Sequence, residues 1–300
     1  MAKKTNKFKD RSVYQQELAE RSGFDEYVGL GRPIDVIDDI SQRTAVAMAL
    51  LIISGVSAYK MIHGMTFMDA AFYALGMAMS LIFSFMIGQE LDPDRTLGGL
   101  IGGFLSAVGY AFFGPSDFVV SIWMLWILRM FTRTSGDRHQ IFDNILIIGS
   151  AAYMGWRGFY LYPMITGAAY VMESQIAFGY FRSLYLAGVA FAALFFAKFN
   201  VQNNGLNVEY IYFLMVVLFL FMPEIRISRF TKAIGDKSFK PISGSRLQVG
   251  LGFFLMTIAS LALLHGNEAV KALVPGIMAA LGCGANLLRA LIMKEVNFEK

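Results

Sequence analysis

The residues with the clearest chemical potential lie in two short polar stretches between hydrophobic segments. The first, residues 88–96, holds three carboxylates within five positions, Glu90, Asp92 and Asp94. Carboxylates this close repel one another unless a cation offsets their charge, and oxygen ligands of this type suit Mg²⁺ or Ca²⁺. We therefore predict a divalent-cation site here, with Mg²⁺ as the expected cofactor. The alternative is that Asp94 or Thr96 only caps the following helix.

The second polar stretch, residues 129–144, combines basic residues with a histidine. His139 and Asp143 are spaced i, i+4, so on a helix they would share a face, where the carboxylate could orient the imidazole. We predict these two as a catalytic pair for acid–base or metal chemistry. Arg133 and Arg138 are predicted to donate hydrogen bonds to a phosphate of the substrate. The alternative is a positively charged loop that only connects two helices.

Two further residues are candidates for substrate binding. Arg246 ends a loop, residues 223–246, that carries six basic residues and could hold a headgroup phosphate. Glu173 is the one acidic residue predicted to lie in the inner part of a bilayer, and a charge in hydrocarbon is costly enough to indicate function. Its functional interpretation is an ion, proton or substrate site, and its alternative is a carboxylate at a helix end hydrated from the cytoplasm.

The composition indicates a membrane protein. Hydrophobic residues make up 56% of the 300 residues, and Gly, Met and Phe are abundant, as expected for helices packed in lipid. The single cysteine, Cys283, excludes an internal disulfide and a thiol metal cluster within one chain. A net charge of only +4, with basic residues beside hydrophobic segments, favours contact with lipid headgroups over nucleic acid.

The elements that must position these residues are ten hydrophobic segments, so we predict an all-α polytopic transmembrane bundle of about ten spans. The bundle would occupy residues 44–293, between a cytosolic arm (1–43) and a cytosolic tail (294–300). Within the arm, Ile34–Ile40 has the spacing of a short amphipathic helix on the membrane surface. The predicted spans are 44–61, 67–87, 97–113, 118–132, 141–156, 162–180, 183–199, 208–222, 247–264 and 269–292.

The basic residues predict the orientation of this bundle. If every segment crosses once, all but four of the 26 Lys and Arg fall on one side, and the exceptions are Lys60, Arg157, Lys198 and Lys271. Short loops enriched in Lys and Arg stay cytoplasmic. We therefore expect both termini in the cytoplasm and the protein in an inner or plasma membrane, with the two polar stretches on the same, cytosolic, face.

Small residues predict which helices pack most closely. Gly98, Gly102, Ser106 and their neighbours give the third segment overlapping GxxxG spacings, and Gly276, Ala280 and Gly284 do the same in the last. Such spacings let helix backbones approach in lipid. We expect these two helices to be central.

The acidic turn resembles known families over a few residues only. Asp92-Pro93-Asp94 resembles the aspartate-rich cytosolic turns of membrane prenyltransferases, although the N-D-x-x-D pattern is absent. Together with His139 it is also distantly similar to small membrane-bound metal-dependent hydrolases, where paired histidines are expected and this chain has one. No residue role is taken from either family.

Three functional hypotheses stay open. The first is a divalent-metal-dependent enzyme acting on a phosphorylated lipid or isoprenoid at the cytosolic leaflet, with His139 as acid or base. The second is a transporter or channel for a small solute, which the number of spans favours and the scarcity of charge in mid-membrane disfavours. The third is a non-catalytic subunit or scaffold that binds a protein partner through residues 1–43 and otherwise contacts membrane lipids.

Overall fold

The computed structural model describes residues 28–32, 36–37, 39–176, 179–199, 205–237 and 239–293. Within these residues the chain is helical and forms no strand, only an isolated bridge between Ile234 and Pro241. The predicted all-α class is therefore confirmed. Residues 1–27 of the predicted arm, part of the surface helix proposed for 34–40, and the tail 294–300 lie outside the described residues.

Each of the ten predicted hydrophobic segments forms a helix in the described part of the chain. Most boundaries agree within a few residues, because runs of apolar residues end at the Gly, Pro and Asp residues that break or cap helices. The helices are α2 (Ile40–Ile62), α3 (Phe67–Leu91), α4 (Thr96–Phe113), α5 (Phe118–Thr132), α6 (Ile141–Trp156), α7 (Leu161–Gln175), α8 (Ser183–Ala192), α9 (Val208–Ile227), α10 (Gly244–Ala272) and α11 (Val274–Ile292), with 3₁₀ turns at Ala193–Phe196 and Ser228–Phe230.

Six of these helices are long and apolar enough to cross a membrane: α2, α3, α4, α9, α10 and α11. The protein is therefore described as an integral, multi-pass helical membrane protein. The others are shorter, and a helix of 15 residues such as α5 spans about 22 Å against a hydrocarbon thickness of about 30 Å. The ten-span topology and the cytoplasmic termini stay predictions.

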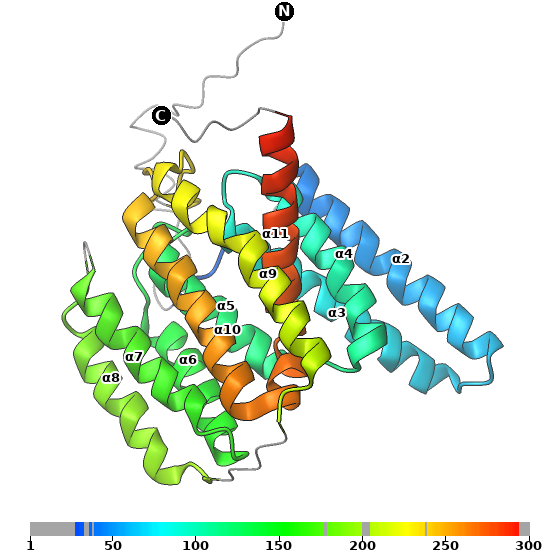
Figure 1. Ribbon diagram of the computed structural model, residues 1–300, viewed down its shortest axis with the longest axis horizontal. Helices are drawn as coiled ribbons and strands as arrows, with labels where there is room; N and C mark the ends of the chain where they lie inside the picture. The colour runs from blue at the N-terminus through cyan, green and yellow to red at the C-terminus, as the bar shows by residue number, and fades with distance from the viewer. Residues whose placement is uncertain are drawn as a thin grey trace, which may run out of the picture.

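The connections between helices gather at two opposite ends of the bundle, and α2 begins at the same end at which α11 finishes (Figure 1). We call one end the network end, because its charged side chains are linked. It comprises residues 28–32, 92–95, 133–140, 179–182, 228–237 and 239–243. The other, the cavity end, comprises residues 63–66, 114–117, 157–160, 197–199 and 266–273.

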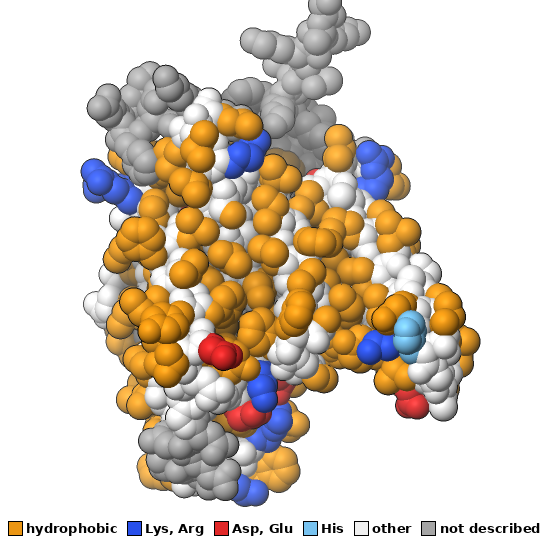
Figure 2. All heavy atoms as spheres, turned by 45° about the vertical axis from the view of Figure 1, so that its right-hand side comes forward, with side chains coloured by type: hydrophobic (Ala, Val, Ile, Leu, Met, Phe, Trp, Pro, Cys, Tyr) orange, Lys and Arg blue, Asp and Glu red, His pale blue; other side chains and the backbone are white. Residues whose placement is uncertain are grey.

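On the face that Figure 2 shows, the surface between the two ends is largely apolar. On the face in Figure 2, hydrophobic side chains form a broad belt, and the coloured Lys, Arg, Asp, Glu and His side chains lie toward the ends. Large apolar side chains of the helices, such as Leu51, Phe104 and Phe219, are exposed. An exposed apolar surface of this extent is what a lipid bilayer covers.

The glycine-based packing prediction is confirmed. A Cβ added at Gly98 would lie 2.9 Å from the Cα of Cys283, and one at Gly102 would lie 2.8 Å from the Cα of Ala279. Helices α4 and α11 therefore touch through their backbones, as the small-residue spacings indicated. The Cβ of Gly99 would lie 3.0 Å from the carbonyl oxygen of Phe85, so α4 packs equally closely on α3.

Three helix boundaries differ from the prediction in ways that matter for the site. Helix α2 begins at Ile40, four residues early, because the side chain of Asp39 accepts hydrogen bonds from the first backbone N–H groups. Helix α7 ends at Gln175, not at residue 180, so Glu173 lies in its last turn. Helix α10 is interrupted at Gly266, whose φ of 65° only glycine adopts readily, and resumes to Ala272.

Candidate functional site

Glu90, at the end of α3, is the centre of the first charge network at the network end. Its side chain is fully buried, and its Oε1 accepts hydrogen bonds from Arg129 Nε (3.0 Å) and Arg32 Nη1 (3.2 Å). Its Oε2 accepts hydrogen bonds from the hydroxyls of Thr132 and Thr134. A buried carboxylate is tolerated when opposite charges and hydrogen bonds surround it in this way. All the acceptor positions of Glu90 are thus directed at protein donors.

The segment 28–32 is held inside this network. Leu30 is fully buried, and the backbone N–H groups of Gly29 and Leu30 donate to Asp143 Oδ2 at 2.8 and 3.1 Å. The carbonyl of Val28 accepts from Lys237 Nζ at 3.1 Å. Arg32 also pairs with Asp236. A Cβ on Gly29 would collide with the carbonyl of Arg138, so only glycine fits there.

The acidic turn directs its other two carboxylates elsewhere. Asp92 Oδ2 accepts from Arg95 Nε at 2.8 Å, and the same guanidinium donates to both oxygens of Glu224 on α9, at 2.6 and 2.7 Å. Asp94 accepts from the backbone N–H of Lys232 at 3.0 Å. The turn therefore joins α3, α4 and α9 through arginine.

The predicted Mg²⁺ site does not fit this arrangement. Glu90, Asp92 and Asp94 face different partners, and no group of three or more His, Cys, Asp or Glu among the described residues is placed to hold a metal ion. The positive charges that offset the carboxylates are arginines. Proximity in the sequence was misleading because the chain leaves α3 between Glu90 and Asp92, and the side chains diverge.

The carboxyl of Asp92 has a raised pKa. Burial raises the pKa of its carboxyl to about 6, and the facing Arg95 offsets only part of that effect. The carboxylate is 2% exposed, so its charged form lacks hydration. Near neutral pH it is ionised, and mild acid protonates it.

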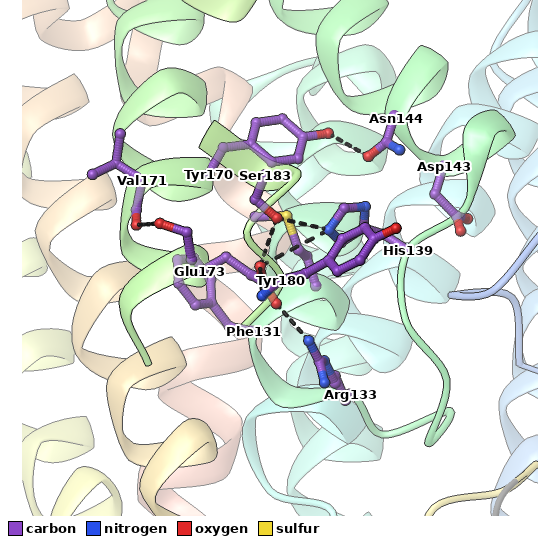
Figure 3. Close-up of polar contacts among 12 residues, drawn as sticks. Phe131, Arg133, His139, Asp143, Asn144, Tyr170, Val171, Glu173, Tyr180 and Ser183 are labelled. Atoms are coloured by element: carbon purple, nitrogen blue, oxygen red, sulfur yellow. Dashed lines mark hydrogen bonds and ion pairs between the residues drawn. The ribbon is translucent and has the colours of Figure 1, made fainter. Parts of the chain in front are cut away.

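A second cluster, the Glu173 cluster, joins four helices (Figure 3). Glu173 Oε1 accepts from Arg133 Nη2 at 2.6 Å and from Arg246 Nη2 at 3.2 Å. Its Oε2 accepts from the hydroxyl of Ser183 at 2.7 Å and from the backbone N–H of Tyr180 at 3.2 Å. Three of the predicted substrate-binding residues thus meet, although Glu173 lies at a helix end and not in mid-bundle.

His139 completes the cluster. Its Nε2 lies 3.1 Å from the hydroxyl of Ser183 and 3.9 Å from Glu173 Oε2. Burial lowers the pKa of the imidazole below its ordinary value, and Arg133 lowers it further, while Glu173 opposes them. The ring is therefore neutral at pH 7. Beside it, the buried Nε of Arg133 has no hydrogen-bond partner in the described structure.

The predicted pairing of Asp143 with His139 is not seen: none of the hydrogen bonds of Asp143 in the described structure goes to His139. Helix α6 begins at Ile141, so His139 precedes the helix and the i, i+4 geometry does not apply. The Oδ2 of Asp143 instead accepts from the backbone N–H of Gln140 at 2.8 Å and from segment 28–32, and its Oδ1 accepts from Trp126 Nε1 at 3.2 Å. Its position is that of a helix cap and anchor.

Arg138, the remaining predicted phosphate ligand, is exposed and lies over the ring of Tyr180, 5.3 Å from its centre.

Several partners in the two charge networks were not predicted from the sequence, namely Arg32, Arg95, Ser183, Glu224 and Asp236. The one signal available was that Glu224 and Asp236 are the acidic residues of the otherwise basic stretch 223–246. Arg246 itself also donates to the carbonyls of Met130 and Phe131, which closes the end of α5.

The cavity end differs in kind. A cavity of about 420 Å³ lies between the α4–α5 connection, the facing ends of α6 and α7, and the piece of α10 after Gly266. Two ion pairs line it, Arg157 with Asp117 and Lys271 with Glu268, the second at 3.2 Å. Apolar residues form the rest of the wall, together with Ser116: Pro115, Phe118, Val119, Met154, Phe159, Tyr162, Ala269 and Ala272.

Comparisons of the chain with known protein families, with characterised proteins and with solved structures found no match. Function is therefore argued from the geometry of the two ends.

Proposed function

We propose that the protein is an integral membrane carrier for a small solute, with the network end as its closed cytosolic gate and the cavity end as its entrance. The observation that carries the proposal is the contrast between the ends of one bundle. Buried ion pairs link separate helices at one end, while a cavity with charged walls opens at the other. Carriers need such a difference, because only one side of the binding site is open at a time.

The distribution of basic residues supports the orientation. Lys60, Arg157, Lys198 and Lys271 are the four that the charge pattern assigns to the outer side, and each lies at or next to the cavity end. Among the residues that the structure describes, most of the other Lys and Arg, including Arg95, lie at the network end, which suits a cytoplasmic location.

The Glu173 cluster has the arrangement of a gate. Its carboxylate on α7 contacts residues that belong to three other elements: Arg133 after α5, Arg246 in the first turn of α10, and Ser183 at the start of α8. Loss of these contacts would separate the α7–α8 pair from α5 and α10 at this end. The interruption of α10 at Gly266 supplies a discontinuous helix beside the cavity, a feature of many carriers.

A second candidate function has an observation of its own. Arg133 and Arg246 converge on Glu173 beside His139, and the buried Nε of Arg133 lacks a partner. Such donors suit the phosphate of a phosphorylated lipid at the cytosolic leaflet. An enzyme of this kind would not use Glu90, Asp92 and Asp94 as metal ligands. Binding of such a lipid that vanishes in Arg133→Gln would favour it over the carrier.

The test of the carrier is reciprocal accessibility. Two buried serines with unpartnered hydroxyls serve as reporters, Ser116 at the cavity end and Ser135 at the network end. Each is replaced by cysteine in a Cys283→Ser chain and labelled with a small methanethiosulfonate reagent. We expect Glu173→Gln to increase labelling at position 135 and to decrease it at position 116.

Controls separate gating from unfolding. Asp94→Asn removes an acceptor of one backbone N–H near an exposed loop and should change neither reporter. Ser183→Ala removes one hydrogen bond to Glu173 and should shift labelling in the same direction as Glu173→Gln, by less. Labelling that rises at both positions, or at neither, would refute the carrier.

A further inference from the structure

The cavity at the cavity end has a wall chemistry that the carrier proposal does not specify. Its charged residues are two cations, Arg157 and Lys271, and two anions, Asp117 and Glu268. The cavity is thus neutral overall but strongly polar at defined points. A ligand with a net charge would find no net opposite charge in it, whereas a ligand with one charge of each sign would match the wall.

The ion pairs of the wall are weak enough to exchange partners. The side chains of Arg157, Glu268 and Lys271 are 40%, 57% and 39% exposed, and that of Asp117 is 21% exposed. Exposed pairs of this kind contribute about 0–1 kcal/mol, so little is lost when a ligand carboxylate or ammonium replaces one partner. At the network end the pairs are buried and the same exchange would be costly.

An independent observation indicates a polar ligand group. Ser116 belongs to the cavity wall, and its hydroxyl is buried behind that surface without a hydrogen-bond partner in the described structure. Buried polar groups are normally satisfied, so an unpartnered hydroxyl in the wall is a donor left for a polar group of a ligand or for a water that reaches it. Beside it, Phe118, Val119 and Phe159 provide apolar surface for a hydrocarbon side chain.

We infer that this cavity binds a small zwitterion with an apolar side chain, of the class of free α-amino acids such as leucine and phenylalanine. Its carboxylate would lie between Arg157 and Lys271, and its ammonium between Asp117 and Glu268. The volume of about 420 Å³ accommodates such a molecule with its hydration. This inference rests on the proposed carrier function, since it names the class of substrate that enters at this end.

Equilibrium binding to the purified full-length protein in nanodiscs tests it. The probes are radiolabelled L-leucine and L-phenylalanine, with N-acetyl-L-leucine, which lacks the ammonium, and L-leucinamide, which lacks the carboxylate, as competitors. We expect both amino acids to bind and both analogues to compete at least about tenfold more weakly, a difference of about 1.4 kcal/mol. Analogues that compete as well as leucine would overturn the inference. So would the absence of binding of either amino acid at a concentration of about 10 mM.

Variants assign the binding to this cavity. Lys271→Met and Glu268→Gln each remove one wall charge at an exposed position, so they should leave folding intact and weaken leucine binding about tenfold or more. Lys60→Met removes a charge next to the same end but outside the cavity wall, and should not change binding. Unchanged binding in Lys271→Met combined with Glu268→Gln would place the ligand elsewhere and refute the assignment.

The two proposals fail separately. Binding of leucine without reciprocal labelling of positions 116 and 135 would keep the ligand class and remove the carrier. Reciprocal labelling without binding of either amino acid would keep the carrier and remove the zwitterion as its substrate.

Discussion

The two ends of the bundle use charge in opposite ways. At the network end, Glu90 and Glu173 are fully buried and each binds two arginines on other elements. At the cavity end, Lys271–Glu268 joins near neighbours and Arg157–Asp117 joins the ends of α6 and α5, and in each pair at least one side chain is 39% or more exposed. Buried pairs between elements hold helices together, because removal of one partner leaves an uncompensated charge. Exposed pairs leave charges free to meet a ligand.

The largest effect is expected at Glu90. Glu90→Gln removes the negative charge between Arg129, which is 3% exposed, and Arg32. An unpaired buried cation costs about 3–5 kcal/mol, enough to lower the melting temperature by more than ten degrees or to prevent folding. Thermal unfolding of the detergent-purified variant measures it. A loss as small as that of Asp94→Asn would show that the network contributes nothing.

A smaller loss is expected when the anchor of segment 28–32 is weakened. Asp143→Asn keeps one oxygen for the three backbone N–H groups but removes the charge and places an amide opposite Trp126 Nε1. We expect a loss of about 1–3 kcal/mol, with faster hydrogen exchange at Gly29 and Leu30 than in the wild type. Unchanged exchange at these two amides would mean that Asp143 does not hold the segment.

Acidification should change the stability of the fold in two opposite ways at the network end, through Asp92 and through His139. The pKa of Asp92 is raised to about 6, so the native state takes up a proton before the unfolded state does. Its contribution to stability is fully present below the ordinary pKa near 3.8 and is lost as the pH rises through 6. The pKa of His139 is lowered, so its contribution is present above the ordinary value of 6.5 and lost as the pH falls.

The two groups can be separated by substitution. Between pH 7.5 and 5.5 Asp92 should add about 1 kcal/mol of stability. Asp92→Asn should therefore lose more stability on acidification than the wild type, and His139→Gln should lose less. Melting temperatures at the two pH values measure both. Equal slopes for the wild type and Asp92→Asn would show that Asp92 has an ordinary pKa.

The smallest effect is expected at the cavity end. Arg157→Gln breaks the pair with Asp117, but the guanidinium is 40% exposed, so we expect a change of less than about 1 kcal/mol. The melting temperatures of Arg157→Gln and Glu90→Gln, measured under the same conditions, give the comparison directly. A loss equal to that of Glu90→Gln would mean that the two ends do not differ in the way described.

The helices could be predicted from the sequence, and the networks could not. Apolar runs ending at Gly, Pro and Asp marked all ten helices, and GxxxG spacings marked α4 and α11 as closely packed helices, although not as partners of each other. The partners of the charges depend on tertiary contacts between distant positions, such as Arg95 and Glu224, which are 129 residues apart. No local pattern encodes such a pair.

The residues of the candidate site could be predicted from the sequence only in part, because their types are visible in it and their partners are not. Arg133, His139, Glu173 and Arg246 were identified by residue type, and they do meet. The end of α7 was predicted five residues too late because apolar residues continue after Gln175, so Glu173 lies in the last turn of the helix, where it accepts from the backbone N–H of Tyr180. The carboxylates of the acidic turn looked like a metal site because their arginine partners lie elsewhere in the sequence.

The most direct measurement is the sidedness of labelling at positions 116 and 135 in an otherwise wild-type chain carrying Cys283→Ser. A membrane-impermeant thiol reagent is applied to intact cells and to inverted membrane vesicles. The account predicts labelling of the cysteine at 116 from outside the cell only, and protection of the cysteine at 135 until the protein is denatured. Rapid labelling at 135 in the native protein, or labelling at 116 from the cytoplasmic side, would contradict it.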